Sequence, residues 1–331
     1  MSPTAVASPA RTECAAVVVH YRDAEATLDC IDSLAAQEPP PAIVVVDNGS
    51  PDGSGAQLER HLADRRGVHL LHAGVNGGFG AGCNRGIEFA LQRWPELAHV
   101  LLLNPDAELA RGSLAELLAT SRRHPDAGIV GCHIEDHAGR TWFANGQLPR
   151  WTLSGFHCPA PPAPEFPTTF VTGACMLLRA DLLRDGLRFD ESYFLYCEDA
   201  DLCCEVRARG HGLWITQRAR VRHVGGGSQP GPRVLGELTA ERLFWLTRAK
   251  VLFARRRLGA AHRLGFLAIA CLLKPLAGLV GSGSVRFLGP YLRGLLSGLR
   301  GDPGPAPHRA AGLNPSGLNP SGLNPSGPSR S

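Results

Sequence analysis

The chain has 331 residues, 44% of them hydrophobic, which is enough for a sizeable core in one large domain or two small ones. Its formal net charge of +4 at pH 7 is small for this length. Ten cysteines would suit a secreted, disulfide-bonded protein, but the first residues lack a basic segment followed by an apolar run. We therefore expect a reduced, cytoplasmic chain whose cysteines act mainly as small hydrophobic residues.

The first half of the chain alternates between short apolar runs and amphipathic segments. The apolar runs predict strands at residues 14–21, 42–50, 68–73, 99–109 and 128–134, and the amphipathic segments predict helices at 26–37, 57–64, 80–94 and 113–124. This alternation is typical of a mostly parallel α/β sheet flanked by helices. Such sheets bind ligands at the carboxyl ends of their strands, which directs attention to residues 47–50 and 104–106.

The second half begins with a strand that runs into a helix at residues 169–183. Acidic residues then begin a helix at Glu198, and a further strand is predicted at 213–223, followed by a glycine-rich loop at 225–232. Helical periodicity resumes at 238–259.

Residues 241–300 are strongly basic, with eleven lysine and arginine residues against one acid, Glu241, whereas the rest of the chain is net acidic. The apolar run 264–280 is interrupted by Lys274 and Pro275, and is short for a membrane span. We expect basic amphipathic helices that lie in a membrane interface on anionic headgroups; the alternative is an ordinary helical region packed on the sheet. Nucleic acid is not expected as a partner, because aromatic residues are sparse here.

These features predict four regions. Residues 1–13 form a disordered N-terminus, 14–232 the α/β domain, 233–300 the basic helical region, and 301–331 a disordered tail that repeats "GLNPS" three times.

Three motifs place polar residues after predicted strands or before a helix. In "VVVDNGSPDGS", Asp47 stands at a strand tip, where its carboxylate could accept a hydrogen bond from a nucleobase or ribose, or could simply form a turn. In "GVNGGFGAGCNRGI", glycines flanked by Asn76 and Asn84 could bring the backbone close to phosphate. In "LLLNPDAEL", Asp106 offers an oxygen ligand to a divalent cation on a diphosphate, or belongs to an Asn-Pro-Asp turn.

A fourth motif, "YFLYCEDADLCC", combines acids with cysteines. Glu198, Asp199 and Asp201 begin a helix, where the helix dipole favours acids in any case. A zinc site is a poor alternative, because Cys197, Cys203 and Cys204 lack paired C-x-x-C spacing. His223, after the next strand, gains meaning only together with the other motifs.

In their order along the chain, these motifs carry a resemblance to a known family. Through "VVVHYR", "VVVDNGSPDGS", "NGGFGAGCNRGI", "LLLNPDAEL", "FVTGACMLLRADLL", "FDESYFLYCEDADLC" and "RVRHVGGGS", the chain resembles the family 2 glycosyltransferases of GT-A fold, and especially their bacterial rhamnosyltransferase branch. The resemblance covers approximately residues 15–228.

The resemblance implies a role for each candidate residue. Asp199 would be the catalytic base, with Glu198 as its catalytic neighbour, and Gly173 and Ala174 would line the acceptor side. Asp106 would occupy the D-x-D position, here Asn104-Pro105-Asp106, and with His223 would bind Mg²⁺ or Mn²⁺. Asp47 would contact the pyrimidine base, and the other nucleotide-sugar-binding residues would be Tyr21, Asn48, Asn76, Gly78, Asn84 and Asn104.

The implied activity is an inverting transfer of a sugar from a dTDP- or UDP-sugar to an acceptor hydroxyl. The asparagine variant of D-x-D favours a dTDP-linked deoxysugar such as rhamnose, and the acceptor would be a lipid-linked or cell-envelope glycan. The protein would then be cytoplasmic, or peripheral on the inner face of the cell membrane. The alternatives are a nucleotidyltransferase, which lacks support because no lysine- and arginine-rich loop follows the first strand, and an inactive nucleotide-sugar-binding module.

Overall fold

The computed structural model describes residues 12–148, 156–223, 238–282 and 284–301. Our predictions of disorder at the two ends therefore fall almost wholly outside the described residues, as does the glycine-rich loop after His223. The four predicted region boundaries remain predictions.

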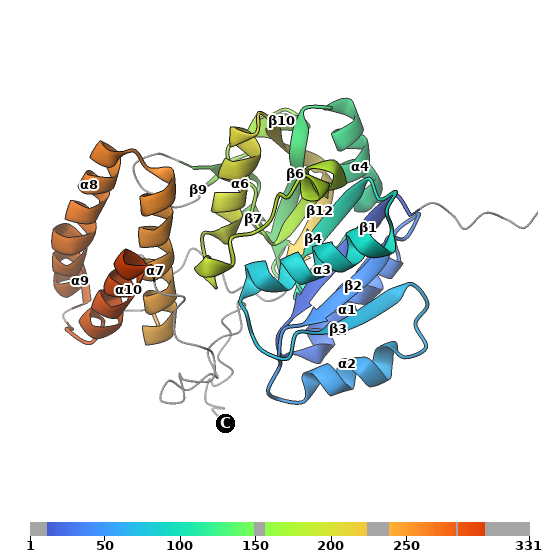
Figure 1. The fold of residues 1–331 in the computed structure, drawn as a ribbon. Helices are drawn as coiled ribbons and strands as arrows, with labels where there is room; N and C mark the ends of the chain where they lie inside the picture. The colour runs from blue at the N-terminus through green and yellow to red at the C-terminus, as the bar shows by residue number, and fades with distance from the viewer. Residues whose placement is uncertain (1–11, 149–155, 224–237, 283, 302–331) are drawn as a thin grey trace, which may run out of the picture.

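A mixed sheet, parallel over its N-terminal half, forms the centre of the α/β domain, with helices packed against it (Figure 1). The strands are β1 (Cys14–His20), β2 (Ala42–Asp47), β3 (Val68–His72), β4 (His99–Leu103), β5 (Ala107–Leu109), β6 (Ala127–Asp136), β7 (Thr141–Phe143), β10 (Glu165–Thr168), β11 (Cys175–Arg179) and β12 (Gly212–His223). The main order is β10-β12-β6-β11-β4-β1-β2-β3, and β8 (Asn145–Gln147) pairs with β9 (Phe156–Cys158) separately.

Parallel pairing joins β4, β1, β2 and β3, and also β6 with β12, while β11 runs antiparallel to both of its neighbours. Every residue of β1 is buried, as expected for a strand covered on both faces. The flanking helices are α1 (Ala24–Ala35), α2 (Ser54–Leu62), α3 (Phe79–Arg93), α4 (Ser113–Arg123), α5 (Ala180–Arg184) and α6 (Glu198–Ala208), with a short 3₁₀ turn η1 (Glu191–Tyr193) before α6. The predicted α/β class is confirmed.

The prediction of one strand at residues 99–109 was wrong in one respect, because this segment forms two strands. β4 ends at Leu103, and β5 leaves it to pair antiparallel with β12, placing Ala107 opposite His223. Pro105 has no N–H for a ladder, so the chain breaks between the two strands. The break leaves Asn104 at the carboxyl end of β4 and brings Asp106 beside the end of β12.

The C-terminal helices form a bundle beside α6 (Figure 1). They are α7 (Ala240–Arg257), α8 (Ala260–Ala268), the π-helical turn η3 (Ile269–Leu273), α9 (Lys274–Ser282) and α10 (Leu288–Arg300). α7 packs closely on α10, because Gly294 and Gly298 of α10 have no side chains to hold the two helices apart.

Several basic residues of this region bind the α/β domain, where we had expected them to face headgroups. Arg248 is fully buried and donates to the carbonyl oxygens of Ser192 and Tyr193. Arg257 forms a two-pronged ion pair with Asp201 at the start of α6, at 2.6 and 2.7 Å. Asp201 is therefore more than the helix-start acid we predicted, because it joins α6 to α7.

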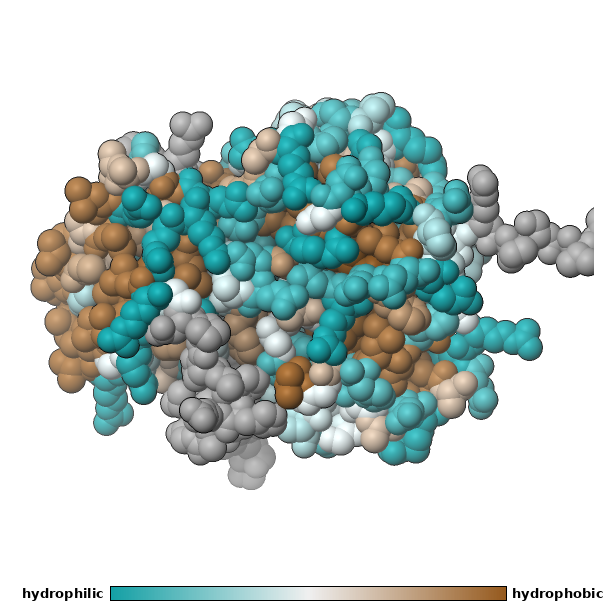
Figure 2. Space-filling view, viewed as in Figure 1, coloured by the Kyte–Doolittle hydropathy of each residue, from teal (hydrophilic) through white to brown (hydrophobic). Residues whose placement is uncertain are grey.

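The run from α8 through η3 to α9 is a continuous helical segment, Ala260–Val280, whose length and mean hydropathy of 1.7 would suffice to cross a membrane. The sequence made this segment look shorter, because Pro275 interrupts it. The π-helical turn η3 ends two residues before Pro275, and the helix continues through the proline into α9. Much of its apolar surface is exposed, as Figure 2 shows over the C-terminal helices; the exposed residues are Leu264, Ile269, Leu272, Leu273, Leu276 and Val280.

Candidate active site

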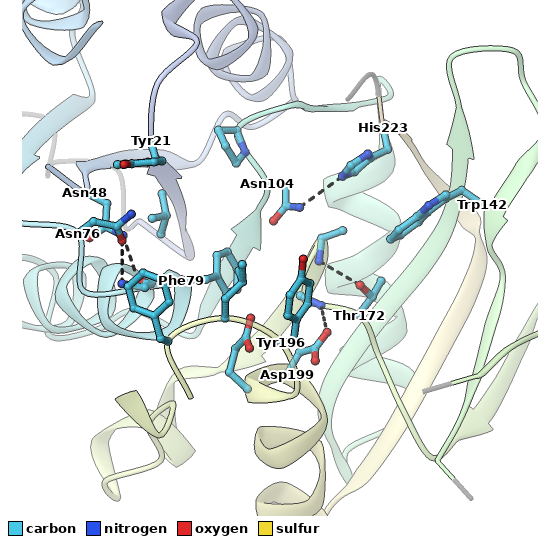
Figure 3. A pocket seen from close by; sticks show the side chains of 18 residues that line it. Tyr21, Asn48, Asn76, Phe79, Asn104, Trp142, Thr172, Tyr196, Asp199 and His223 are labelled. Carbon is cyan, nitrogen blue, oxygen red and sulfur yellow. Dashed lines mark hydrogen bonds between the residues drawn. The ribbon is translucent and has the colours of Figure 1, made fainter. Parts of the chain in front are cut away.

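A cleft lies where several strand ends meet the start of α6 (Figure 3). Tyr21, Asn48 and Asn104 each follow the carboxyl end of a strand, and His223 ends β12. Gly173 and Ala174 precede β11, and Glu198 and Asp199 begin α6; all four also line the cleft. The structure thus gathers in one cleft most of the residues that the sequence singled out.

One wall is a glycine loop held by two asparagines. The Asn48 amide donates to Asn76 Oδ1 and to the Gly78 carbonyl oxygen, both at 3.0 Å, and the Gly78 N–H donates to Asn76 Oδ1 at 2.9 Å. Tyr21 lies on the same side of the cleft (Figure 3). These hydrogen bonds fix the loop against the tip of β2, so the asparagines shape the wall while the aromatic ring of Tyr21 faces the space.

Two predicted donor-binding residues do not line the cleft. Asp47 Oδ1 accepts from the Ser50 N–H at 3.0 Å, and its Oδ2 lies 3.3 Å from His72 Nδ1. The Asn84 amide donates to the Phe189 carbonyl oxygen and its Oδ1 accepts from the Phe189 N–H, at 2.9 Å each. Contact of Asp47 with a base would require it to exchange one of these partners, and Asn84 positions the segment that leads to α6.

Asp106 lies behind the cleft wall formed by Asn104 and His223. Its Oδ1 is 3.4 Å from His223 Nε2, and the Asn104 amide nitrogen is 3.3 Å from the same ring nitrogen. Neither carboxylate oxygen of Asp106 has a hydrogen-bond partner among the described residues, nor does His223 Nδ1. Burial raises the pKa of Asp106, and the neighbouring His223 is the strongest opposing influence.

The unpaired carboxylate oxygens of Asp106, with His223 Nε2 beside them, fit a divalent cation. A buried carboxylate without partners is energetically unfavourable, and a cation would satisfy it. Over the described ranges, no three His, Cys, Asp or Glu side chains gather as a metal site. The protein would therefore supply Asp106 and His223, and oxygen atoms of a diphosphate and water would complete the shell, as Mg²⁺ commonly requires.

Asp199 and Glu198 stand side by side at the start of α6, in different environments. Asp199 accepts from the Gly173 N–H at 3.1 Å and from the Ala200 N–H at 2.8 Å, whereas Glu198 Oε2 is buried without a partner. Burial raises the pKa of both groups, and it raises that of Glu198 to about 8, with the Asp199 charge adding to the effect. The backbone donors favour charge on Asp199, whereas burial and the Asp199 charge favour the protonated form of Glu198.

A strained loop closes the cleft beside α6, and the sequence did not reveal it. Phe194, Tyr196 and Cys197 have φ of 62°, 70° and 66°, in the left-handed region that non-glycine residues rarely occupy. Phe194 accepts a hydrogen bond from the Phe79 N–H at 3.0 Å, and its ring stacks on Trp245 of α7 at 4.3 Å. Strain of this kind clusters at functional sites. Without glycines, the segment carries no sequence signal for it.

Trp142 was also missed. Its ring is stacked parallel to His223 with centroids 5.0 Å apart, and it lines the cleft (Figure 3). It comes from the short strand β7, which sequence periodicity did not predict.

The cysteines do not form a zinc site. All ten are free thiols, and Cys203 is buried against the backbone of Val171. The prediction that most cysteines act as small hydrophobic residues fits the six that are fully buried.

Comparison with known proteins assigns the family. Residues 15–187 match the family model described as glycosyl transferase family 2. The chain is 31% identical over 191 residues to N-acetylglucosaminyl-diphospho-decaprenol L-rhamnosyltransferase of Mycobacterium tuberculosis, covering 50% of this chain and 61% of that protein. It is 27% identical over 206 residues to the low-salt glycan biosynthesis hexosyltransferase Agl10 of Haloferax volcanii, covering 61% and 63%. The chain thus spans about three-fifths of the length of these relatives.

Solved structures share the fold. TarS residues 1–349 of S. aureus superpose with a TM-score of 0.55 at 16% identity, covering 91% of this chain and 83% of that one. GalNAc-T7, solved with UDP, GalNAc and Mn²⁺, gives 0.60 at 14% identity, covering 88% and 57%. Since the family model covers more than half of the chain and the fold agrees, this protein belongs to glycosyl transferase family 2.

Proposed function

We propose that the protein is an inverting glycosyltransferase that moves a sugar from a nucleoside-diphosphate donor to a hydroxyl of a lipid-linked or cell-envelope glycan. The observation that supports this best is a single cleft lined by Asp199 and His223, with the unpaired carboxylate of Asp106 directly behind it. An inverting transfer needs a base on one side and charge neutralisation on the other. Membership of family 2 argues against the nucleotidyltransferase alternative.

In the proposed reaction, the acceptor oxygen attacks the anomeric carbon and its proton passes to Asp199. The bond from that carbon to the diphosphate oxygen breaks as the new glycosidic bond forms. The backbone N–H groups of Gly173 and Ala200 hold the Asp199 carboxylate in place. Because Glu198 is protonated in this proposal, the pair carries one negative charge and not two. General-base catalysis contributes roughly 10²–10⁴-fold to such a step.

Asp106 and His223 would hold Mg²⁺ or Mn²⁺ at the donor side. When bound, the cation would offset negative charge on the departing nucleoside diphosphate. Asn104 adjoins both residues and would contact the donor directly.

A dTDP-linked deoxysugar such as rhamnose is the donor we favour, with UDP-sugars as the alternative. The relative from M. tuberculosis is an L-rhamnosyltransferase, and this chain has an asparagine at the first D-x-D position. Tyr21, Asn48, Asn76 and Gly78 would face the nucleotide from the opposite wall.

We further propose that the protein binds peripherally to the inner face of the cell membrane through α8 and α9. The exposed leucines of this segment support the proposal, together with the exposed arginines Arg286 and Arg293 close to it. Removing the segment should abolish flotation with anionic liposomes.

The decisive experiment is a donor screen with purified protein, scored by nucleoside diphosphate release in the presence of a lipid-linked glycan acceptor. For the donor that turns over, Asp199→Asn should lower transfer by about 10²–10⁴-fold and leave donor affinity unchanged. Asp185→Asn, which changes an exposed acid outside the cleft, is the matched control. Unchanged turnover in Asp199→Asn would disprove the assigned base, and donor binding without transfer to any acceptor would favour the inactive binding module.

A further inference from the structure

A small cavity inside the C-terminal bundle contains two lysines. It has a volume of about 30 Å³ and lies among α7, α8, η3, α9 and α10. Its walls are otherwise mostly apolar, with Phe266 and Ala270 on one side and Lys250 and Lys274 contributing the only charges among the described lining residues. No acidic side chain of the described residues forms an ion pair with either lysine.

The two ammonium groups are in an unfavourable setting without an anion. Burial lowers the pKa of Lys250, and burial together with the charge of Lys250 lowers the pKa of Lys274 to about 8. The ring of Phe266, 5.6 Å from Lys274 Nζ, gives only partial compensation. Two neighbouring cations in an apolar cavity would be stabilised strongly by a bound anion.

One of the two lysines is also close to the start of α6. Lys250 acts electrostatically on Cys197, where it is the strongest influence opposing the effect of burial on the thiol pKa. Cys197 caps α6 two residues before Asp199, and Trp245 of α7 stacks on the strained loop.

The outer side of the cavity is continuous with the exposed apolar segment. Lys274 begins α9, and its neighbours Leu272, Leu273 and Leu276 are 69%, 59% and 58% exposed. Figure 2 shows this apolar surface over the C-terminal helices. A hydrocarbon chain attached to a phosphate in the cavity would therefore lie on an apolar helix face.

We propose that Lys250 and Lys274 bind the phosphate of the lipid-linked acceptor, and that its hydrocarbon chain runs along the exposed face of α8, η3 and α9. This inference rests on the proposed glycosyltransfer and names how that activity selects its acceptor. The position of Lys250, close to Cys197 and inward from the surface, favours an acceptor phosphate over a bulk lipid headgroup. Headgroups would meet the exposed Arg286 and Arg293 first.

The test is binding of the full chain to phosphatidylcholine vesicles, with no sugar donor present. One set of vesicles contains a polyprenyl phosphate, a second the same polyprenol without phosphate, and a third an equal mole fraction of phosphatidylglycerol. Wild-type protein should bind the polyprenyl phosphate vesicles at least tenfold more tightly than either other set. Lys250→Gln and Lys274→Gln should each reduce that preference to twofold or less, whereas Arg293→Gln should keep it.

Equal binding to polyprenol and polyprenyl phosphate would overturn the proposal, and so would phosphatidylglycerol acting as well as the polyprenyl phosphate. Equal loss in Arg293→Gln would also overturn it, because it would indicate diffuse charge attraction. Lys274→Gln decides the matter if Lys250→Gln unfolds, since Lys274 belongs to the exposed segment. Because this test contains no sugar donor, it is independent of the transfer assay. The proposed phosphate site can therefore be refuted while sugar transfer is confirmed, and sugar transfer can be refuted while the phosphate site is confirmed.

Discussion

Replacing Glu198 with glutamine should stabilise the folded protein at neutral and alkaline pH. The Glu198 side chain is 7% exposed, and its Oε2 has no partner in the part of the chain that the structure describes. Its pKa is raised from 4.5 to about 8, by burial and then by the charge of Asp199. The folded state therefore prefers the protonated form, which glutamine imitates in shape and neutrality.

The sign and size follow from linkage. Because the folded pKa lies above the unfolded one, the stability that protonated Glu198 contributes is complete below pH 4.5 and is lost progressively up to pH 8. The loss is about 1.4 kcal/mol per pH unit, which gives about 3 kcal/mol at pH 7 and about 5 kcal/mol above pH 8. Glu198→Gln avoids this loss, so its advantage over wild type should grow across the same range.

The assay is chemical denaturation of both proteins at several pH values between 5 and 9. Glu205→Gln is the matched control on the same helix, because Arg209 and Arg257 lower the pKa of Glu205 and its replacement should destabilise the protein at neutral pH. A constant difference between Glu198→Gln and wild type over this range would refute the reasoning, since it would show that Glu198 titrates normally.

Three further changes test other parts of the site. Asp106→Asn should lower metal-dependent transfer at least tenfold in a Mn²⁺ titration; an unaltered response would remove Asp106 from the proposed ligand set. Gly78→Ala should destabilise the protein by about 1–3 kcal/mol in denaturant, because φ is +91° and the new Cβ would overlap the Phe194 carbonyl oxygen; full stability would contradict this close contact. Arg257→Ala should cost about 3–5 kcal/mol, because it leaves the buried Asp201 carboxylate without its ion-pair partner and with only the Tyr193 hydroxyl as a side-chain donor, and adding Asp201→Asn should recover part of the loss by removing the buried charge; no recovery would mean that the pair is not the cause.

The sequence predicted the fold class and the location of the candidate site from local patterns. Apolar runs alternating with amphipathic segments report burial directly, and they found β1, β2, β4 and most helices. The rule that ligands bind at the carboxyl ends of strands then pointed to the tips of β2 and β4. The order of the motifs was sufficient to indicate the family.

Side-chain direction could not be predicted in the same way. Asp47 and Asn84 stand in the expected segments, yet both turn toward protein partners, because His72 beside Asp47 and Phe189 beside Asn84 are residues that only folding brings near. The opposite holds for Trp142, whose short strand has no periodic signal but whose ring stacks on His223.

By itself, the sequence determined the α/β alternation, the family resemblance and the concentration of positive charge near the C-terminus, because these are properties of neighbouring residues. Only the tertiary structure decided how those charges are used. Arg248 and Arg257 bind the α/β domain, while Lys250 and Lys274 share a cavity inside the C-terminal bundle. The physical reason is that the fold decides which groups, often distant in sequence, lie beside a charge. A count of lysines and arginines cannot distinguish a charge that is paired in this way from one that is not.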